Sequence, residues 1–194
     1  MGTKTSMLRS DSDAEGLLLK AGEALKAVEG AQGHKYVYLG PKEAQPGTVA
    51  HTWTDMRHGV MVMLGIDGQI PARYLVVQSR DDASAERVSQ LLAEKLPVLS
   101  RDALLSEARD LEKDPGAILR LAMGTADEED PTDVNGLLVG ALGSANARVR
   151  ANAAMGATFS RSSSLVKPLK TALKTEKEAG VKRLLKAAVE VCSD

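Results

Sequence analysis

The stretch LLVGALGSANARVRANAAMGA, residues 137–157, contains a tripeptide that occurs twice in this chain. Ala122-Met123-Gly124 reappears as Ala154-Met155-Gly156. The repeat continues along the chain, because Val149-Arg150 is followed at the same offset by Val181-Lys182. An internal repeat of roughly 30 residues is typical of helix pairs that stack on one another.

The repeated segment resembles the HEAT and HEAT-like (PBS-lyase-type) family, whose unit is a helix, a tight turn and a second helix that opens with Val-Arg before small residues. A second unit spans 164–188 and a more degenerate one spans 101–124, so the resemblance covers the C-terminal half. It implies a short α-solenoid, in which each helix pair buries one face against its neighbours. The residues that carry the resemblance are Leu138, Ala141, Leu142, Val149, Arg150, Ala153, Ala154, Gly156 and Ala157.

The N-terminal half has a different pattern. Apolar residues at helical spacing between Leu17 and Val28 predict an amphipathic helix, and a second helix is predicted after Asp81, with apolar positions from Val88 to Leu96. Asp67-Gly68 is a strong hairpin signal, which favours an antiparallel meander for the β-rich region between the helices. Segments rich in Val, Tyr, Thr and Ile predict its four strands at 35–39, 48–54, 59–64 and 72–78.

These patterns divide the chain into three parts. Residues 1–13 are polar and lack periodicity, and are predicted to be a flexible arm. Residues 14–99 are predicted to form an α+β domain with a small antiparallel sheet flanked by helices. Residues 100–194 are predicted to form the HEAT-like helical repeat domain. The expected fold class is therefore α+β followed by a short α-solenoid.

Composition limits the classes of function. The chain has 194 residues, of which 43% are apolar and 26% charged, with a net charge of -1. No apolar run approaches the roughly 20 residues that span a bilayer, so we expect no membrane partner. Cys192 is the only cysteine, which excludes an intramolecular disulfide. We expect a cytoplasmic protein.

The charge is unevenly distributed in the helical half. Residues 101–134 hold ten acidic and four basic residues, whereas residues 148–194 hold ten basic and four acidic ones. The run Asp127, Glu128, Glu129, Asp130, with Asp133 beyond it, is either a solvated loop or a patch that docks a protein. The lysines from 167 to 177 recur at spacings of three and four, as on one helical face. Candidate residues for binding a partner or an anion are Arg148, Arg150, Lys167, Lys170, Lys174, Lys177, Lys182 and Arg183.

Only one group of residues suggests chemistry. His51, Trp53 and Asp55 alternate along a predicted strand, and His58 follows three residues later, so a metal site or an acid–base pair is conceivable there. Their spacing matches no metal-binding signature, which favours packing or partner contact. The chain contains no nucleotide-binding or catalytic motif. We therefore predict no catalytic residue, no metal and no cofactor.

The repeat, the uneven charge and the missing motifs favour a non-catalytic adaptor that binds another protein of unknown identity. The alternative is a nucleic-acid-binding protein that uses the same basic helical face, with affinity that falls steeply with salt. An enzyme is a third class. It rests on fold analogy alone, because HEAT-like repeats occur in lyases that attach or detach bilin chromophores.

Overall fold

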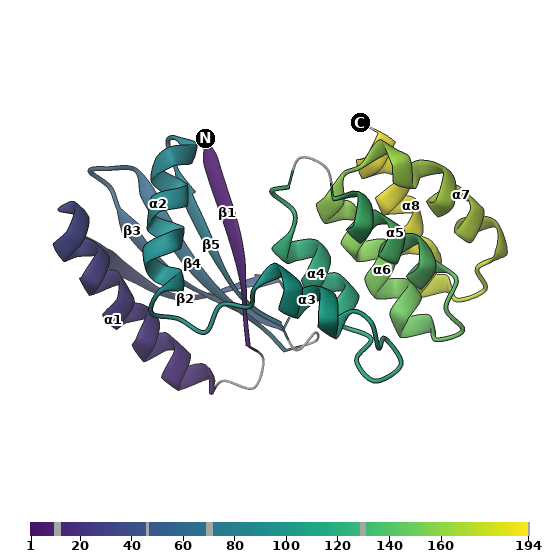
Figure 1. Cartoon of the computed structure of the whole chain (residues 1–194), viewed down its shortest axis with the longest axis horizontal. Coiled ribbons are helices and arrows are strands. Elements are labelled where there is room, and N and C mark those ends of the chain that lie inside the picture. The colour runs from purple at the N-terminus through teal and green to yellow at the C-terminus, as the bar shows by residue number, and fades with distance from the viewer. Residues whose placement is uncertain (10–12, 46, 69–71, 129–130, 194) are drawn as a thin grey trace. The chain divides into compact units, whose positions relative to one another are not determined.

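A computed structural model describes residues 1–9, 13–45, 47–68, 72–128 and 131–193. The chain forms two compact units, Met1–Leu99 and Ser100–Asp194. The first combines a sheet with helices and the second is helical, so the fold is mixed α+β (Figure 1). Among the described residues, none of the helices is both long enough and apolar enough to cross a membrane.

Within its described residues, the first unit contains five strands and two helices. Its sheet is antiparallel throughout, with the strand order β1-β5-β4-β3-β2. The predicted meander is thus confirmed for the four strands from β2 to β5. In chain order the elements are β1 (Gly2–Leu8), α1 (Ala14–Gln32), β2 (Val37–Gln45), β3 (Thr48–Asp55), β4 (Val60–Asp67), β5 (Ala72–Ser79) and α2 (Asp82–Ala93).

The flexible arm predicted for residues 1–13 is wrong for its first part, because Gly2–Leu8 is strand β1. This strand pairs with β5 over its whole length, from Gly2 opposite Ser79 to Leu8 opposite Arg73. The backbone hydrogen bonds with β5 hold Gly2–Leu8 as a strand, although its polar side chains do not indicate one. Residues 10–12 of the predicted arm lie outside the described residues.

Strand β2 is longer than predicted. The expected strand ended at residue 39, but β2 runs on to Gln45 with register shifts along its pairing with β3. Proline is tolerated here because β2 is an edge strand and needs no N–H on its outer side. Gly40 adopts a positive φ of 91° beside the first shift, a conformation that glycine accepts without strain.

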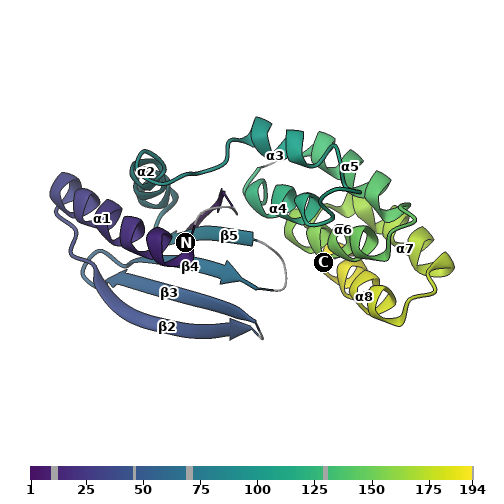
Figure 2. The same cartoon turned by 90° about the horizontal axis from the view of Figure 1, so that it is seen from below.

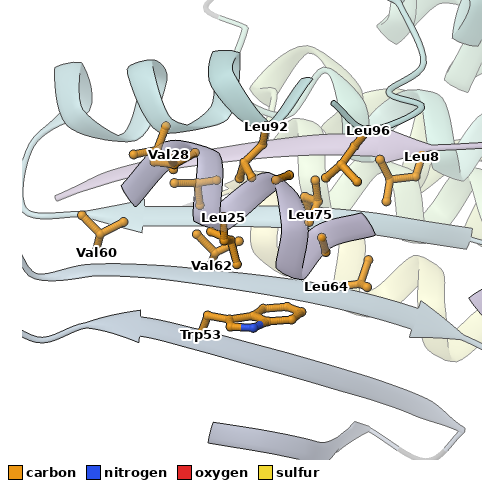
Figure 3. Packing of buried hydrophobic residues seen from close by; sticks show 14 of the residues in the cluster. Leu8, Leu25, Val28, Trp53, Val60, Val62, Leu64, Leu75, Leu92 and Leu96 are labelled. Atoms are coloured by element: carbon orange, nitrogen blue, oxygen red, sulfur yellow. The ribbon is translucent and has the colours of Figure 1, made fainter. Parts of the chain in front are cut away.

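Helices α1 and α2 cover the same face of the sheet (Figure 2). Asp13 caps α1 by accepting from the Gly16 N–H, and Gly33 ends it in the left-handed conformation. Leu25 of α1 and Leu92 of α2 belong to the core, which continues across the sheet to Trp53 and Val62, paired on β3 and β4 (Figure 3). Burial of this apolar face removes it from water, which is the main favourable term in folding.

The described elements of the second unit are all helices. The helices α4, α6 and α8 pack on one another in that order, and α5 packs on α6 and α7, while α7 packs on α8. Their bounds are α3 (Arg101–Glu107), α4 (Ala117–Gly124), α5 (Thr132–Leu142), α6 (Ala147–Ser160), η1 (Ser163–Leu165), α7 (Val166–Thr175) and α8 (Ala179–Ser193).

Val149 and Val181, one repeated pair, occupy the same place near the starts of α6 and α8. Helices α6 and α8 begin at Ala147 and Ala179, which are separated by the same interval as the two copies of the sequence repeat. The two copies of the tripeptide meet, because a Cβ at Gly156 would lie 3.0 Å from the Cβ of Ala122 and 2.8 Å from Cδ2 of Leu138. Small residues at these positions therefore let α6 approach α4 and α5 closely.

Candidate functional site

Most of the predicted basic residues are exposed on the second unit. Lys167, Lys170 and Lys174 lie on α7, on the side away from the buried Leu169. Lys177 does not continue this stripe, because the chain leaves the helical conformation at Glu176. The remaining exposed members of the set are Arg148 on α6 and Lys182 and Arg183 on α8.

Arg150 differs from the others because it is only partly exposed and its side chain donates to groups within the unit. Its Nε and Nη2 donate to the two carboxylate oxygens of Glu176 at 2.7 and 3.0 Å. Its Nη1 donates to the backbone carbonyls of Ser144 and Ala145, each at 2.9 Å. The hydrogen bonds from Arg150 also lower the pKa of the Glu176 carboxyl to about 2, against the opposing effect of burial. Arg150 therefore joins the α5–α6 turn to the α7–α8 turn.

A groove of about 410 Å³ lies between α5 and α7. Its walls are mostly apolar, with Val139 and Leu142 from α5 and Pro168 and Ala172 from α7. Val139 is 41% exposed. Lys167 lines the groove, so one of the predicted basic residues borders an open apolar surface.

The acidic run is partly engaged in internal ion pairs. Arg101 donates to Glu128 at 2.8 Å and to Asp133 at 2.7 Å. Both contacts are at the surface, where such pairs contribute little to stability. Glu129 and Asp130 lie outside the described residues, so the predicted patch as a whole is not placed.

The predicted group on strand β3 separates into two clusters. His51 accepts or donates a hydrogen bond of 2.6 Å with the hydroxyl of Tyr38, and the Tyr38 ring lies 5.1 Å from the indole of Trp53. Asp55 and His58 form the second cluster, where Nδ1 of His58 donates to Oδ2 of Asp55 at 2.6 Å. Trp53 is only 7% exposed, so it belongs to the core rather than to a polar site.

The second cluster has a member that sequence spacing did not reveal. Nδ1 of His34 lies 3.3 Å from the same oxygen of Asp55, and the His34 and His58 rings are 4.5 Å apart. Burial of Asp55 would raise its pKa, but hydrogen bonds from His58 and the Lys35 N–H together hold that pKa well below its ordinary value. Burial and the neighbouring His58 lower the pKa of His34. The Asp55 carboxylate therefore faces a His34 imidazole that is neutral near pH 7.

Cys192 behaves as a buried apolar residue. It is 3% exposed, and its thiol donates to the Ala157 carbonyl at 3.3 Å, which joins α8 to α6. Burial raises the pKa of the thiol, which disfavours the reactive thiolate. This side chain thus packs the helical unit.

Comparison with known protein families, curated proteins and solved structures found no match to this chain. The geometry of its own residues is therefore the basis for assigning a function. Candidate sites within the described residues include the groove between α5 and α7 and the cluster of His34, Asp55 and His58.

Proposed function

We propose that this protein is a non-catalytic adaptor that binds another protein through its helical unit, built as a short array of HEAT-like helix pairs. The pairing of α5 with α6 and of α7 with α8 supports this. The starts of α6 and α8 also keep the offset of the sequence repeat. Stacked helix pairs present extended surfaces that commonly bind polypeptides.

The observation that carries the proposal is the apolar groove between α5 and α7 with a lysine at its border. Val139, Leu142 and Pro168 offer apolar contact, and Lys167 lies among them. Lys170 and Lys174 extend the positive charge along the same helix. A complementary ligand is a polypeptide segment that combines apolar side chains with Asp or Glu, since burial supplies affinity and charge supplies orientation.

Nucleic acid is the alternative partner for the same lysines. Arg150 is unavailable for it, because three of its nitrogens donate within the unit. An apolar groove also adds nothing to backbone-phosphate binding, which depends on the number of cations. The groove therefore favours a protein partner over a nucleic acid.

The test compares proteins recovered by wild-type and variant chains from nuclease-treated lysate of the cells that make this protein. Val139→Glu places a charge in the groove and Lys167→Glu reverses its border charge. Lys182→Glu is the matched control, because Lys182 is an exposed lysine on α8 and does not line the groove. We expect a partner retained by the wild type and the control and lost by both groove variants.

Retention of every partner by both groove variants would contradict the proposal. A parallel titration with duplex and single-stranded nucleic acid at low and moderate salt tests the alternative. Salt-sensitive binding that Lys167→Glu weakens would replace the protein partner with nucleic acid.

A further inference from the structure

Three side chains from separate segments meet at one end of the sheet in the first unit. His34 lies in the connection between α1 and β2, Asp55 is the last residue of β3, and His58 is in the turn before β4. One ligand atom of each lies within 4.8 Å of the other two. Two imidazoles and one carboxylate are a donor set that divalent transition metals commonly use.

The carboxylate of Asp55 is fixed in place by the backbone. Its Oδ1 accepts the N–H groups of Arg57 and His58 at 2.9 and 3.2 Å, which shapes the turn between β3 and β4. Its Oδ2 accepts the Lys35 N–H at 3.0 Å and faces both imidazoles. Formation of the β3–β4 turn accounts for the hydrogen bonds to Oδ1. The same turn would form without two histidines beside Oδ2.

The imidazoles of His34 and His58 make different contacts with Asp55. Nδ1 of His58 donates to Oδ2 at 2.6 Å. Nδ1 of His34 is buried and, within the described residues, has no hydrogen-bond partner, although it lies 3.3 Å from Oδ2. A buried ring nitrogen without a partner is costly, and a cation between it and the carboxylate would satisfy both.

We propose that His34, Asp55 and His58 bind a divalent transition-metal ion of the Zn²⁺ class. Tetrahedral ligand atoms at about 2.0–2.1 Å from Zn²⁺ are about 3.3 Å apart. Nδ1 of His34 already has this separation from Oδ2 of Asp55, at 3.3 Å. His58, at 2.6 Å, has to retreat by about 0.7 Å, which its 38% exposed side chain allows.

Such a site has a closed side and an open side. The Tyr36 ring stacks on His34 at 5.6 Å between centroids, with 11° between their planes. The exposure of His58 leaves the fourth position of a three-ligand site to solvent. The ion would tie the α1–β2 connection to the β3–β4 turn, so its binding would stabilise the first unit. This inference is independent of the proposed adaptor function, which concerns the second unit.

The test is titration of the full chain, freed of metal by a chelator, with Zn²⁺ by calorimetry and thermal unfolding. We expect one ion per chain and a raised Tm. His34→Gln and His58→Gln each remove a ligand and should weaken the affinity by at least about tenfold. His51→Gln is the matched control, because His51 is the chain's remaining histidine and pairs with Tyr38.

A second measurement does not depend on variants that fold. In proton NMR of the wild-type chain, Zn²⁺ should shift the imidazole resonances of His34 and His58 and leave those of His51 in place. The proposal is overturned by the absence of one bound Zn²⁺ per chain, or by wild-type affinity in either ligand variant. Shifts confined to His51 would also overturn it.

Discussion

At the scale of single residues, the pair of Arg150 and Glu176 is a charged contact with many hydrogen bonds in the helical unit. Arg150 is 19% exposed and Glu176 only 3% at the side chain. Glu176 also accepts the N–H groups of Lys177 and Glu178 at 2.8 and 2.9 Å. A bidentate pair with this burial contributes more than a surface salt bridge.

Replacement of Arg150 should be clearly destabilising. Arg150→Ala leaves the buried Glu176 carboxylate without its cation, which we expect to lower the free energy of unfolding by about 1–3 kcal/mol. Urea denaturation measures the change. Arg148→Ala, the exposed arginine two residues earlier, should change it by less than about 0.5 kcal/mol. Equal losses in the two variants would contradict the structural role of Arg150.

Glu176 should also make stability depend on pH. Its pKa is lowered by the Arg150 hydrogen bonds from 4.5 to about 2, so the unfolded chain binds this proton more readily than the folded one. The stabilisation is therefore complete above the unfolded pKa and is lost as pH falls from about 5 to about 2. Glu176→Gln should thus lose less stability than the wild type between about pH 6 and about pH 3, measured by urea denaturation. Equal losses would contradict the depressed pKa.

The histidine cluster shows what sequence spacing can and cannot predict. Asp55 and His58 are three residues apart, and the alternation along one strand indicated a polar group there. His34 is distant from Asp55 in the sequence, with the whole of β2 between them. Its approach depends on the pairing of β2 with β3 and on the length of the α1–β2 connection, which no local pattern encodes. The same limit applies to Arg150, whose partner Glu176 lies in another helix pair.

At the scale of elements, close helix packing rests on Gly156. A Cβ there would come within 2.8 Å of Leu138 and 3.0 Å of Ala122, both buried. By contrast, a Cβ at Gly140 of α5 would meet no atom within 4 Å. The two glycines sit in similar helices but differ in what surrounds them.

This difference predicts opposite effects of alanine. Gly156→Ala should destabilise by about 1–3 kcal/mol through overpacking, which outweighs the gain in helix propensity. Gly140→Ala should stabilise by up to about 1 kcal/mol, because only the propensity changes. Thermal or urea unfolding compares them. Stabilisation by both substitutions would show that α6 does not approach α4 and α5 closely.

Elements with strong local signals were predictable and β1 was not. The helix from Ala14 has an N-cap and periodic leucines, and β2 to β5 have β-branched runs with turn residues between them. Gly2–Leu8 has neither, since its only large apolar residues are Met7 and Leu8. Its order comes from pairing with β5 and from the bridge between Leu8 and Val98. Such long-range contacts are invisible in the local sequence.

At the scale of the whole molecule, the chain consists of two units with separate cores, divided between residues 99 and 100. The last strand, β5, ends at Ser79, and α2 still belongs to the first unit. The two ends of the first unit are in contact, because the Leu99 N–H donates to the carbonyl of Met7 in β1 at 2.8 Å.

Each unit should therefore fold alone. Chains of residues 1–99 and 100–194, produced separately, are expected to unfold cooperatively in urea and to show dispersed NMR spectra. Fragment 1–99 should also retain the Zn²⁺ binding proposed for His34, Asp55 and His58. A disordered fragment would mean that the two cores are not independent.

Whether a polypeptide partner occupies the groove between α5 and α7 is tested most directly by site-specific photocrosslinking in the cells that make this protein. A photoreactive amino acid at Val139 lies in the groove, and one at Val191 of α8, also an exposed valine, is the control. The proposal predicts a protease-sensitive, nuclease-resistant adduct from Val139 and none from Val191. No adduct at Val139, the same adduct from both positions, or a nuclease-sensitive adduct would contradict it.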